Sequence, residues 1–190
     1  MKAINEIYLN KEIIKQVREN FRQSEEIIVL TEFLKKRECE KIKKRARKLS
    51  GEKIIIPDKF SYFKICDKEV NEIFNSDEFL KFISGIITKG VKVKETSIRK
   101  FGHRDYTLLH DDSNTQEGYE FFFFISDNWS HSFGGCKVYV DTQGKKDSLI
   151  FIPENNKFCL IKCKNRRGFM KYVNHLAEDR EIILVEGFVR

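Results

Sequence analysis

Several features that mark common protein classes are missing from this sequence of 190 residues. It has no run of about 18 consecutive apolar residues, and charge interrupts the N-terminal segment MKAINEIYLNKEII every few positions, so we predict neither a membrane span nor a secretory signal. The five cysteines are odd in number and form no CxxC pair, which argues against a disulfide framework or a zinc site. Internal repeats and low-complexity tracts are also absent from the sequence. We therefore expect a cytoplasmic protein with reduced thiols.

The first half of the chain has a mainly helical pattern. With 41% hydrophobic residues, the chain can form one domain, residues 1–190, that buries a sizeable core. Within residues 1–90 apolar positions recur at helical spacing, and Ser76 is suited to begin a helix as its N-cap. The elements predicted there are helices at Lys11–Gln23, at Lys35–Lys48 and after Ser76, with extended segments at Glu26–Leu30 and Lys59–Ile65.

Residues 91–190 have a strand-like pattern almost throughout. Short β-branched and aromatic runs alternate there with polar turns, and about eight such runs favour an antiparallel β-sandwich or barrel. We predict an α+β protein, mostly β, in which the N-terminal helices pack on the outside of the barrel. The runs are VKVKETSIRKF, RDYTLLHDD, YEFFFFISD, GGCKVYVDT, DSLIFIP, KFCLIKC, MKYVNHL and EIILVEGFV.

Basic residues outnumber acidic ones by 36 to 29, for a net charge of +7, and much of the excess lies in Lys35–Lys48, KKRECEKIKKRARK. A basic segment of this kind suits contact with RNA or another acidic partner. The alternative is a solvated helix face, because apolar residues recur at helical spacing and leave the basic side chains on the outer side. These apolar residues are Cys39, Ile42, Ala46 and Leu49. We favour the solvated face and keep RNA contact as the alternative.

The sequence contains four histidines, and the segment YTLLHDD places His110 two residues before Asp112. If a strand ends at the histidine, both side chains project to one side and can meet at one point. His175, in YVNHL, can supply a third ligand from a facing strand. Two imidazoles and one carboxylate suit ferrous iron in an oxygenase. Alternatively, His110 caps a turn and His175 is a core residue, and the His-x-Asp spacing alone does not decide between these interpretations.

Arg180 adds a second observation in favour of an oxygenase. An enzyme that uses 2-oxoglutarate needs a cation for the distal carboxylate of this cosubstrate, and a guanidinium binds a carboxylate through two donors. Arg180 follows His175 by five residues, an interval that suits a tight hairpin leading into the last strand.

Four segments, in order, resemble the iron- and 2-oxoglutarate-dependent oxygenases with a double-stranded β-helix core, in their prolyl-hydroxylase branch. The likeness covers roughly residues 26–190 and is greatest to the eukaryotic enzymes that hydroxylate a proline of a small-subunit ribosomal protein, although this chain has room for only one of their two β-helix domains. Its most specific part is LLHDD followed by a loop with Trp129 and a Gly-Gly pair. The segments are KFGHRDYTLLHDD, FFFFISDNWSHSFGGCKVYV, FIPENNKFCLIK and VNHLAEDREIILVEGF.

The resemblance implies a jelly-roll or cupin-like barrel over residues 91–190, with residues 1–90 as helical support. It further implies that His110, Asp112 and His175 bind Fe(II), and that dioxygen is the co-reactant.

The resemblance also implies how 2-oxoglutarate is held. Arg180 would pair with its C5 carboxylate, and ascorbate would stimulate the reaction. Family members carry a tyrosine where this chain has Phe101 and another where it has Phe124, so the cosubstrate has fewer hydroxyl partners here.

The implied activity is hydroxylation of a protein side chain, a prolyl residue at its 3- or 4-position, with a ribosomal protein as partner. Trp129 and His131 would lie on a loop near the substrate. Trp129 either lines a pocket for the prolyl ring or packs into the core, and we favour packing. His103 and His131 are expected at the surface.

Two other functions fit parts of the sequence. A nucleic-acid demethylase of the same fold would use the positive charge, but such enzymes resemble one another in a second arginine, six residues after the cosubstrate arginine, where this chain has Glu186. A catalytically inactive module that binds RNA or the ribosome would instead use Lys35–Lys48.

Overall fold

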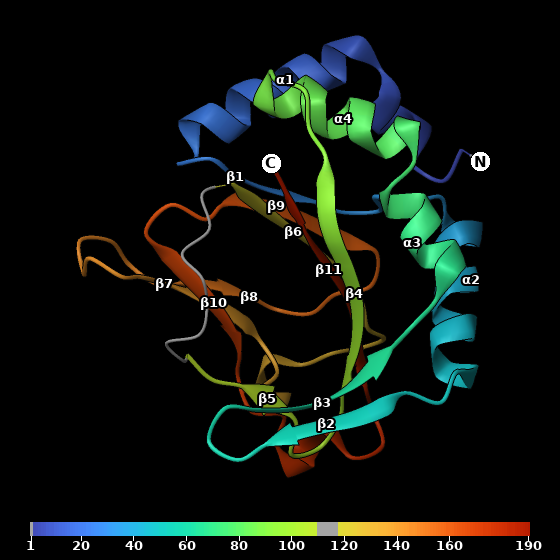
Figure 1. Ribbon diagram of the computed structural model, residues 1–190, viewed down its shortest axis with the longest axis vertical. Helices are drawn as coiled ribbons and strands as arrows, with labels where there is room; N and C mark the ends of the chain where they lie inside the picture. The colour runs from blue at the N-terminus through green and yellow to red at the C-terminus, as the bar shows by residue number, and fades with distance from the viewer. Residues whose placement is uncertain (1, 110–117) are drawn as a thin grey trace.

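The computed structural model describes residues 2–109 and 118–190, except for the side chain of Glu95. Two antiparallel sheets face each other, and helices cover the outer side of the larger one (Figure 1). The eight-stranded sheet has the order β1-β9-β6-β11-β4-β3-β2, with β5 paired to β3, and the three-stranded sheet has the order β10-β7-β8. The strands are β1 (Ile27–Leu30), β2 (Glu52–Ile56), β3 (Phe60–Ile65), β4 (Val93–Phe101), β5 (Tyr106–Thr107), β6 (Tyr119–Ile125), β7 (Lys137–Asp141), β8 (Leu149–Phe151), β9 (Lys157–Lys162), β10 (Arg166–Met170) and β11 (Ile182–Val189).

The helices largely follow the predicted pattern. Ser76 accepts a hydrogen bond from the backbone N–H of Phe79 at 3.2 Å, which confirms its expected role as an N-cap. Helix α3 was not predicted from the sequence, because its seven residues are too few to show helical periodicity. The helices are α1 (Lys11–Gln23), α2 (Lys36–Lys48), α3 (Lys68–Phe74) and α4 (Asp77–Ile87), with 3-10 turns η1 (Glu6–Leu9), η2 (His131–Phe133) and η3 (His175–Ala177).

The phenylalanine run of β6 divides between two cores. Alternate residues of a strand point to opposite faces, so Phe121 and Phe123 join the core beneath the helices, where Phe121 stacks on Phe74 with ring centroids 5.5 Å apart. Phe122 and Phe124 face the second sheet and join the core between the two sheets. All four phenylalanines are fully buried. The two-sheet arrangement with helices outside is therefore the one that the sequence predicted.

The N-terminal half does more than provide helices. Its strands β1, β2 and β3 belong to the eight-stranded sheet, where β1 and β2 form the two edges. β2 was not predicted, because the three consecutive isoleucines at its end do not alternate with polar residues. Within the described ranges, no helix is long and apolar enough to cross a membrane.

The five cysteines are all free thiols, as predicted. Cys39, Cys136 and Cys159 are buried. Burial raises the pKa of the Cys39 thiol to about 12, which keeps it protonated and unreactive at neutral pH.

Candidate functional site

Of the predicted iron ligands, the structure places only His175. His110 and Asp112 lie outside the described residues, which resume at Gly118. His175 begins the turn η3, and its side chain is exposed. The position of the other two predicted ligands therefore remains a prediction from the sequence.

The strand expected over MKYVNHL is wrong. β10 ends at Met170, and Asn174 then caps η3 by accepting a hydrogen bond from the N–H of Leu176 at 2.9 Å. The side chain of Asn174 also donates to the carbonyl of Ser132 in η2 at 2.6 Å. Because an asparagine in this capping role ends extended structure, His175 lies on a surface turn.

The hairpin expected between His175 and Arg180 is also wrong. β11 begins two residues after Arg180 and pairs with β4 and β6, whereas β10 pairs with β7. Arg180 is exposed, and its guanidinium carbon lies 4.9 Å from the centroid of the Phe133 ring. The structure thus brings Arg180 and His175 to the same turn region, both on the outside of the molecule.

Phe101 and Phe124, expected beside the cosubstrate, are fully buried in the core between the two sheets. This core, which we call the inter-sheet core, contains ring contacts of Phe122 with Phe124, Tyr139 and Phe151 at centroid distances of 5.1–5.9 Å. The side chains that fill it are therefore mainly aromatic and aliphatic.

Met170 and Ile182 close the inter-sheet core at the ends of β10 and β11. Met170 is 2% exposed, and its N–H donates to the hydroxyl of Thr107 on β5 at 2.7 Å. Ile182 is fully buried. Met170 and Ile182 are thus part of the apolar lining of the inter-sheet core.

The described residues contain one of the three predicted iron ligands, His175. Among the residues that the structure describes, no three His, Cys, Asp or Glu side chains lie together as a metal site. Any site that uses His175 and Arg180 is open to solvent, because both side chains are exposed.

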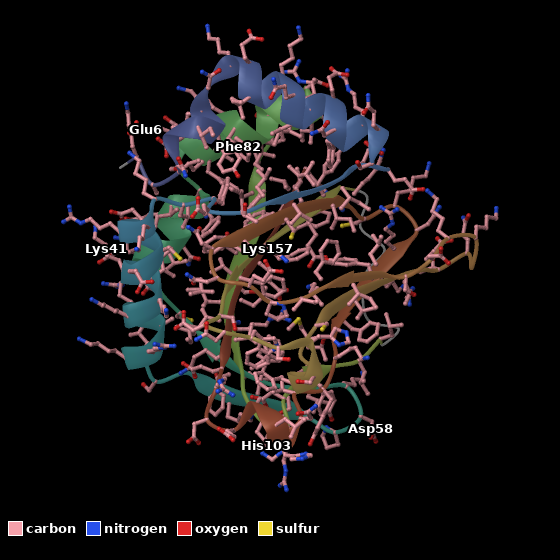
Figure 2. The ribbon with its side chains drawn as sticks, turned by 180° about the vertical axis from the view of Figure 1, so that it is seen from behind. Glu6, Lys41, Asp58, Phe82, His103 and Lys157 are labelled. Atoms are coloured by element: carbon pink, nitrogen blue, oxygen red, sulfur yellow. The ribbon has the colours of Figure 1, made fainter. Side chains whose placement is uncertain are left out.

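Trp129 has the packing role that we favoured. Its indole N–H donates to the carbonyl of Gly134 at 3.0 Å, and its ring meets Phe133 edge to face at 5.6 Å. His131 is exposed at the start of η2, and His103 is exposed as well. Figure 2 shows His103 pointing outward at the end of the molecule opposite α1.

A buried ion cluster beside the inter-sheet core was not predicted from the sequence. Lys137 on β7 contacts Glu120 at 2.8 Å and Glu186 at 2.9 Å, and Glu186 also contacts Arg99 at 2.8 Å. A cavity of about 150 Å³ adjoins these groups. Burial alone would lower the pKa of Lys137, but the two carboxylates outweigh burial and raise it. No local sequence pattern predicts this cluster, because its four members lie on four different strands.

Helix α2 has the buried face that the sequence predicted, formed by Cys39, Ile42 and Ala46. Lys43, expected on the outer side, is buried as well, because Asp127 supplies an anionic partner at 2.5 Å. Several of its basic residues are held by acidic partners within the protein, which accords with a solvated, internally paired face. The pairs are Lys41 with Glu38, Lys43 with Glu40 and Asp127, Arg45 with Asp67 and Glu69, and Arg47 with Asp127.

Residues 58–185 match the protein family described as "Oxoglutarate and iron-dependent oxygenase degradation C-term". Prolyl 3-hydroxylase OGFOD1 of Xenopus laevis is 25% identical to the chain over an alignment of 226 residues, gaps included. The alignment covers 94% of this chain and 44% of the frog protein. The chain thus spans less than half the length of this curated relative.

Two solved structures share the fold. An oxidoreductase of the 2OG-Fe(II) oxygenase family from Burkholderia pseudomallei superposes with a TM-score of 0.72 at 13% identity, over 93% of this chain and 90% of that one. A prolyl-4-hydroxylase from Pseudomonas putida superposes with a TM-score of 0.64 at 10% identity, over 94% of this chain and 99% of that one. These likenesses confirm the predicted double-stranded β-helix.

Proposed function

Because the chain belongs to the family of oxoglutarate and iron-dependent oxygenase degradation C-terminal domains, we propose that it functions in the iron- and 2-oxoglutarate-dependent hydroxylation of a protein substrate. The residue hydroxylated is a prolyl residue, the substrate is a ribosomal protein, and the reaction takes place in the cytoplasm. The observation that carries this proposal is the alignment of 94% of the chain with a prolyl 3-hydroxylase.

The proposed ligands for Fe(II) are His110, Asp112 and His175, with Arg180 for 2-oxoglutarate and dioxygen as co-reactant. His175 and Arg180 are both accessible from solvent near η2 and η3. His110 and Asp112 lie outside the described residues, so the position of this set relative to the inter-sheet core is part of the proposal.

A specific observation favours a second candidate function, that of a binding domain that leaves oxidation to another part of a longer protein. Fully buried aromatic and aliphatic side chains occupy the inter-sheet core, including Phe101, Phe124 and Ile182. A packed core of this kind stabilises a scaffold. In this role the chain contributes surfaces for the protein substrate or the ribosome.

One experiment separates the two candidates. The purified chain is mixed with Fe(II) and 2-oxoglutarate, and succinate formation and iron binding are measured. If the chain is itself the oxygenase, succinate forms, and both readouts are lost on Asp112→Ala or His175→Ala. The matched controls Asp111→Ala and His103→Ala retain both readouts. Absence of succinate together with absence of iron binding would assign the chain to the binding role.

A further inference from the structure

A polar cavity of about 280 Å³ lies where three connecting segments meet. The segments are the α1–β1 connection at residues 24–26, the β7–β8 connection at residues 142–148 and the β9–β10 turn at residues 163–165. Figure 1 shows the β7–β8 connection extending beyond the body of the two sheets. We call this cavity with its lining residues the turn pocket.

The lining of the turn pocket is basic and contains no apolar side chain. Its five basic residues are Lys145, Lys146, Lys162, Lys164 and Arg166, against three acidic ones. Interfaces with proteins need an apolar centre, whereas interfaces with nucleic acids are polar and positively charged. The composition of the lining therefore favours a phosphate-bearing partner over an acidic protein.

Two glutamates of this chain already occupy part of the pocket as internal anions. Glu25 lies 2.9 Å from the ammonium of Lys146 and 2.6 Å from the guanidinium of Arg166, and Glu26 pairs with Lys162. The hydrogen bond from Lys146 is the main reason why the pKa of Glu25 is lowered. These carboxylate oxygens stand where the oxygens of a bound phosphate would stand.

The backbone around the two glutamates is strained. Glu25 and Glu26 have φ angles of 57° and 60°, so two consecutive residues with side chains adopt the left-handed conformation. Strain of this kind persists only where surrounding contacts hold it, and the ion pairs of Glu25 and Glu26 supply such contacts. The side chain of Arg166 is only 8% exposed, so it forms a fixed base for the pocket.

Two lysines at the rim remain available. Lys145 and Lys164 are exposed, and neither forms an ion pair with an acidic residue of the described ranges. Helix α2 differs, since four of its basic residues are held by acidic partners. The turn pocket is therefore better suited than α2 to attract a polyanion.

We propose that the turn pocket binds the phosphodiester backbone of RNA. A phosphate first contacts the exposed Lys145 and Lys164. It then replaces Glu25 and Glu26 as the partner of Lys146, Lys162 and Arg166. This binding is independent of the RNA sequence, because the lining of the turn pocket lacks the aromatic side chains that stack on bases. The proposal does not depend on the hydroxylation activity and survives if the chain turns over no 2-oxoglutarate.

The test is a salt titration of binding to fluorescein-labelled oligouridylate, followed by fluorescence anisotropy. The double variant Lys145→Gln/Lys164→Gln should bind about tenfold more weakly at low salt, and the slope of log affinity against log salt should become shallower by about 1.4 for two lost contacts. The variant Glu25→Gln/Glu26→Gln should bind more tightly, by about tenfold, since internal anions no longer compete. The matched control is Lys36→Gln/Lys44→Gln, which removes the same charge from exposed positions of α2.

Two results would overturn the proposal. Equal losses in the turn-pocket and α2 variants would show that RNA responds only to net charge. Poly-L-glutamate that competes as well as oligouridylate of the same charge would assign the pocket to acidic proteins. Because all four substituted lysines are exposed, circular dichroism should show an unchanged fold in both lysine variants.

Discussion

The ammonium of Lys137 lies 2.9 Å from a carboxylate oxygen of Glu186, and this contact joins the three-stranded sheet to the eight-stranded sheet from inside the fold. The side chains are 7% and 10% exposed, respectively. Glu120 and Arg99 complete a cluster in which two cations face two anions. Each buried charge is thus compensated only while its partners remain in place.

Removal of the Lys137 cation should be strongly destabilising. In Lys137→Met, the carboxylates of Glu120 and Glu186 stay buried without this partner, and we expect the free energy of unfolding to fall by about 3–5 kcal/mol. The control Lys36→Met replaces an exposed lysine and should change it by less than about 0.5 kcal/mol. Urea unfolding measures both. Equal changes in the free energy of unfolding for Lys137→Met and Lys36→Met would mean that the cluster contributes nothing to stability.

The same cluster predicts sensitivity to acid. Burial alone would raise the pKa of Glu186, but Arg99 and Lys137 outweigh burial and hold it below its ordinary value of 4.5. A lowered pKa in the folded state gives stability that is complete above the unfolded-state pKa and is lost as the pH falls toward the folded-state pKa. We expect the free energy of unfolding to decrease below about pH 4.5. Unfolding curves of Glu186→Gln at several pH values should show a flatter dependence there, and an unchanged dependence would place the responsible carboxylate elsewhere.

Phe124→Tyr tests whether the inter-sheet core is packed or open. The Phe124 ring is fully buried, 5.5 Å from the ring of Phe122. A hydroxyl added there without a partner should cost about 1–3 kcal/mol of stability in guanidinium unfolding. Phe63→Tyr is the control, because that ring is 36% exposed and its hydroxyl can reach water. Unchanged stability with gain of 2-oxoglutarate binding would reveal room for the cosubstrate.

Gly134 follows η2 directly, and Gly144, in the β7–β8 connection, is its control for the effect of a positive φ alone. Both have positive φ angles, 74° and 65°. A Cβ atom on Gly134 would lie 2.1 Å from the carbonyl oxygen of Tyr172, whereas one on Gly144 meets nothing within 4 Å. Alanine at Gly144 should cost about 1–2 kcal/mol for its positive φ. Gly134 has φ 74° and ψ −146°, a conformation open essentially to glycine alone, so Gly134→Ala should cost about 1–3 kcal/mol for the backbone and about 1–3 kcal/mol more for the clash. Thermal unfolding should rank Gly134→Ala well below Gly144→Ala, and the reverse order would show that this turn can move aside.

The helices and strands were predicted better than the surroundings of His175 and Arg180, because those surroundings depend on contacts between distant parts of the chain. His175 and Arg180 were placed on strands from the apolar character of their neighbours, but Asn174 caps a turn and bonds to Ser132, 42 residues away in the chain. The pairing of β11 with β4 and β6 likewise joins segments that no local pattern connects. Side-chain direction at strand ends depends on such distant partners.

Local chemistry along the chain accounts for α1, the cap at Ser76, the alternating faces of β6 and the resemblance to the oxygenases. These features depend on residues a few positions apart, whose preferences act in the same way in any fold. Long-range packing decided that apolar side chains fill the inter-sheet core, that His175 and Arg180 face solvent, and that Lys137 meets Glu186 across 49 residues. A buried charge is stable only beside its counterion, and the two sheets bring these partners together only when the whole chain has folded.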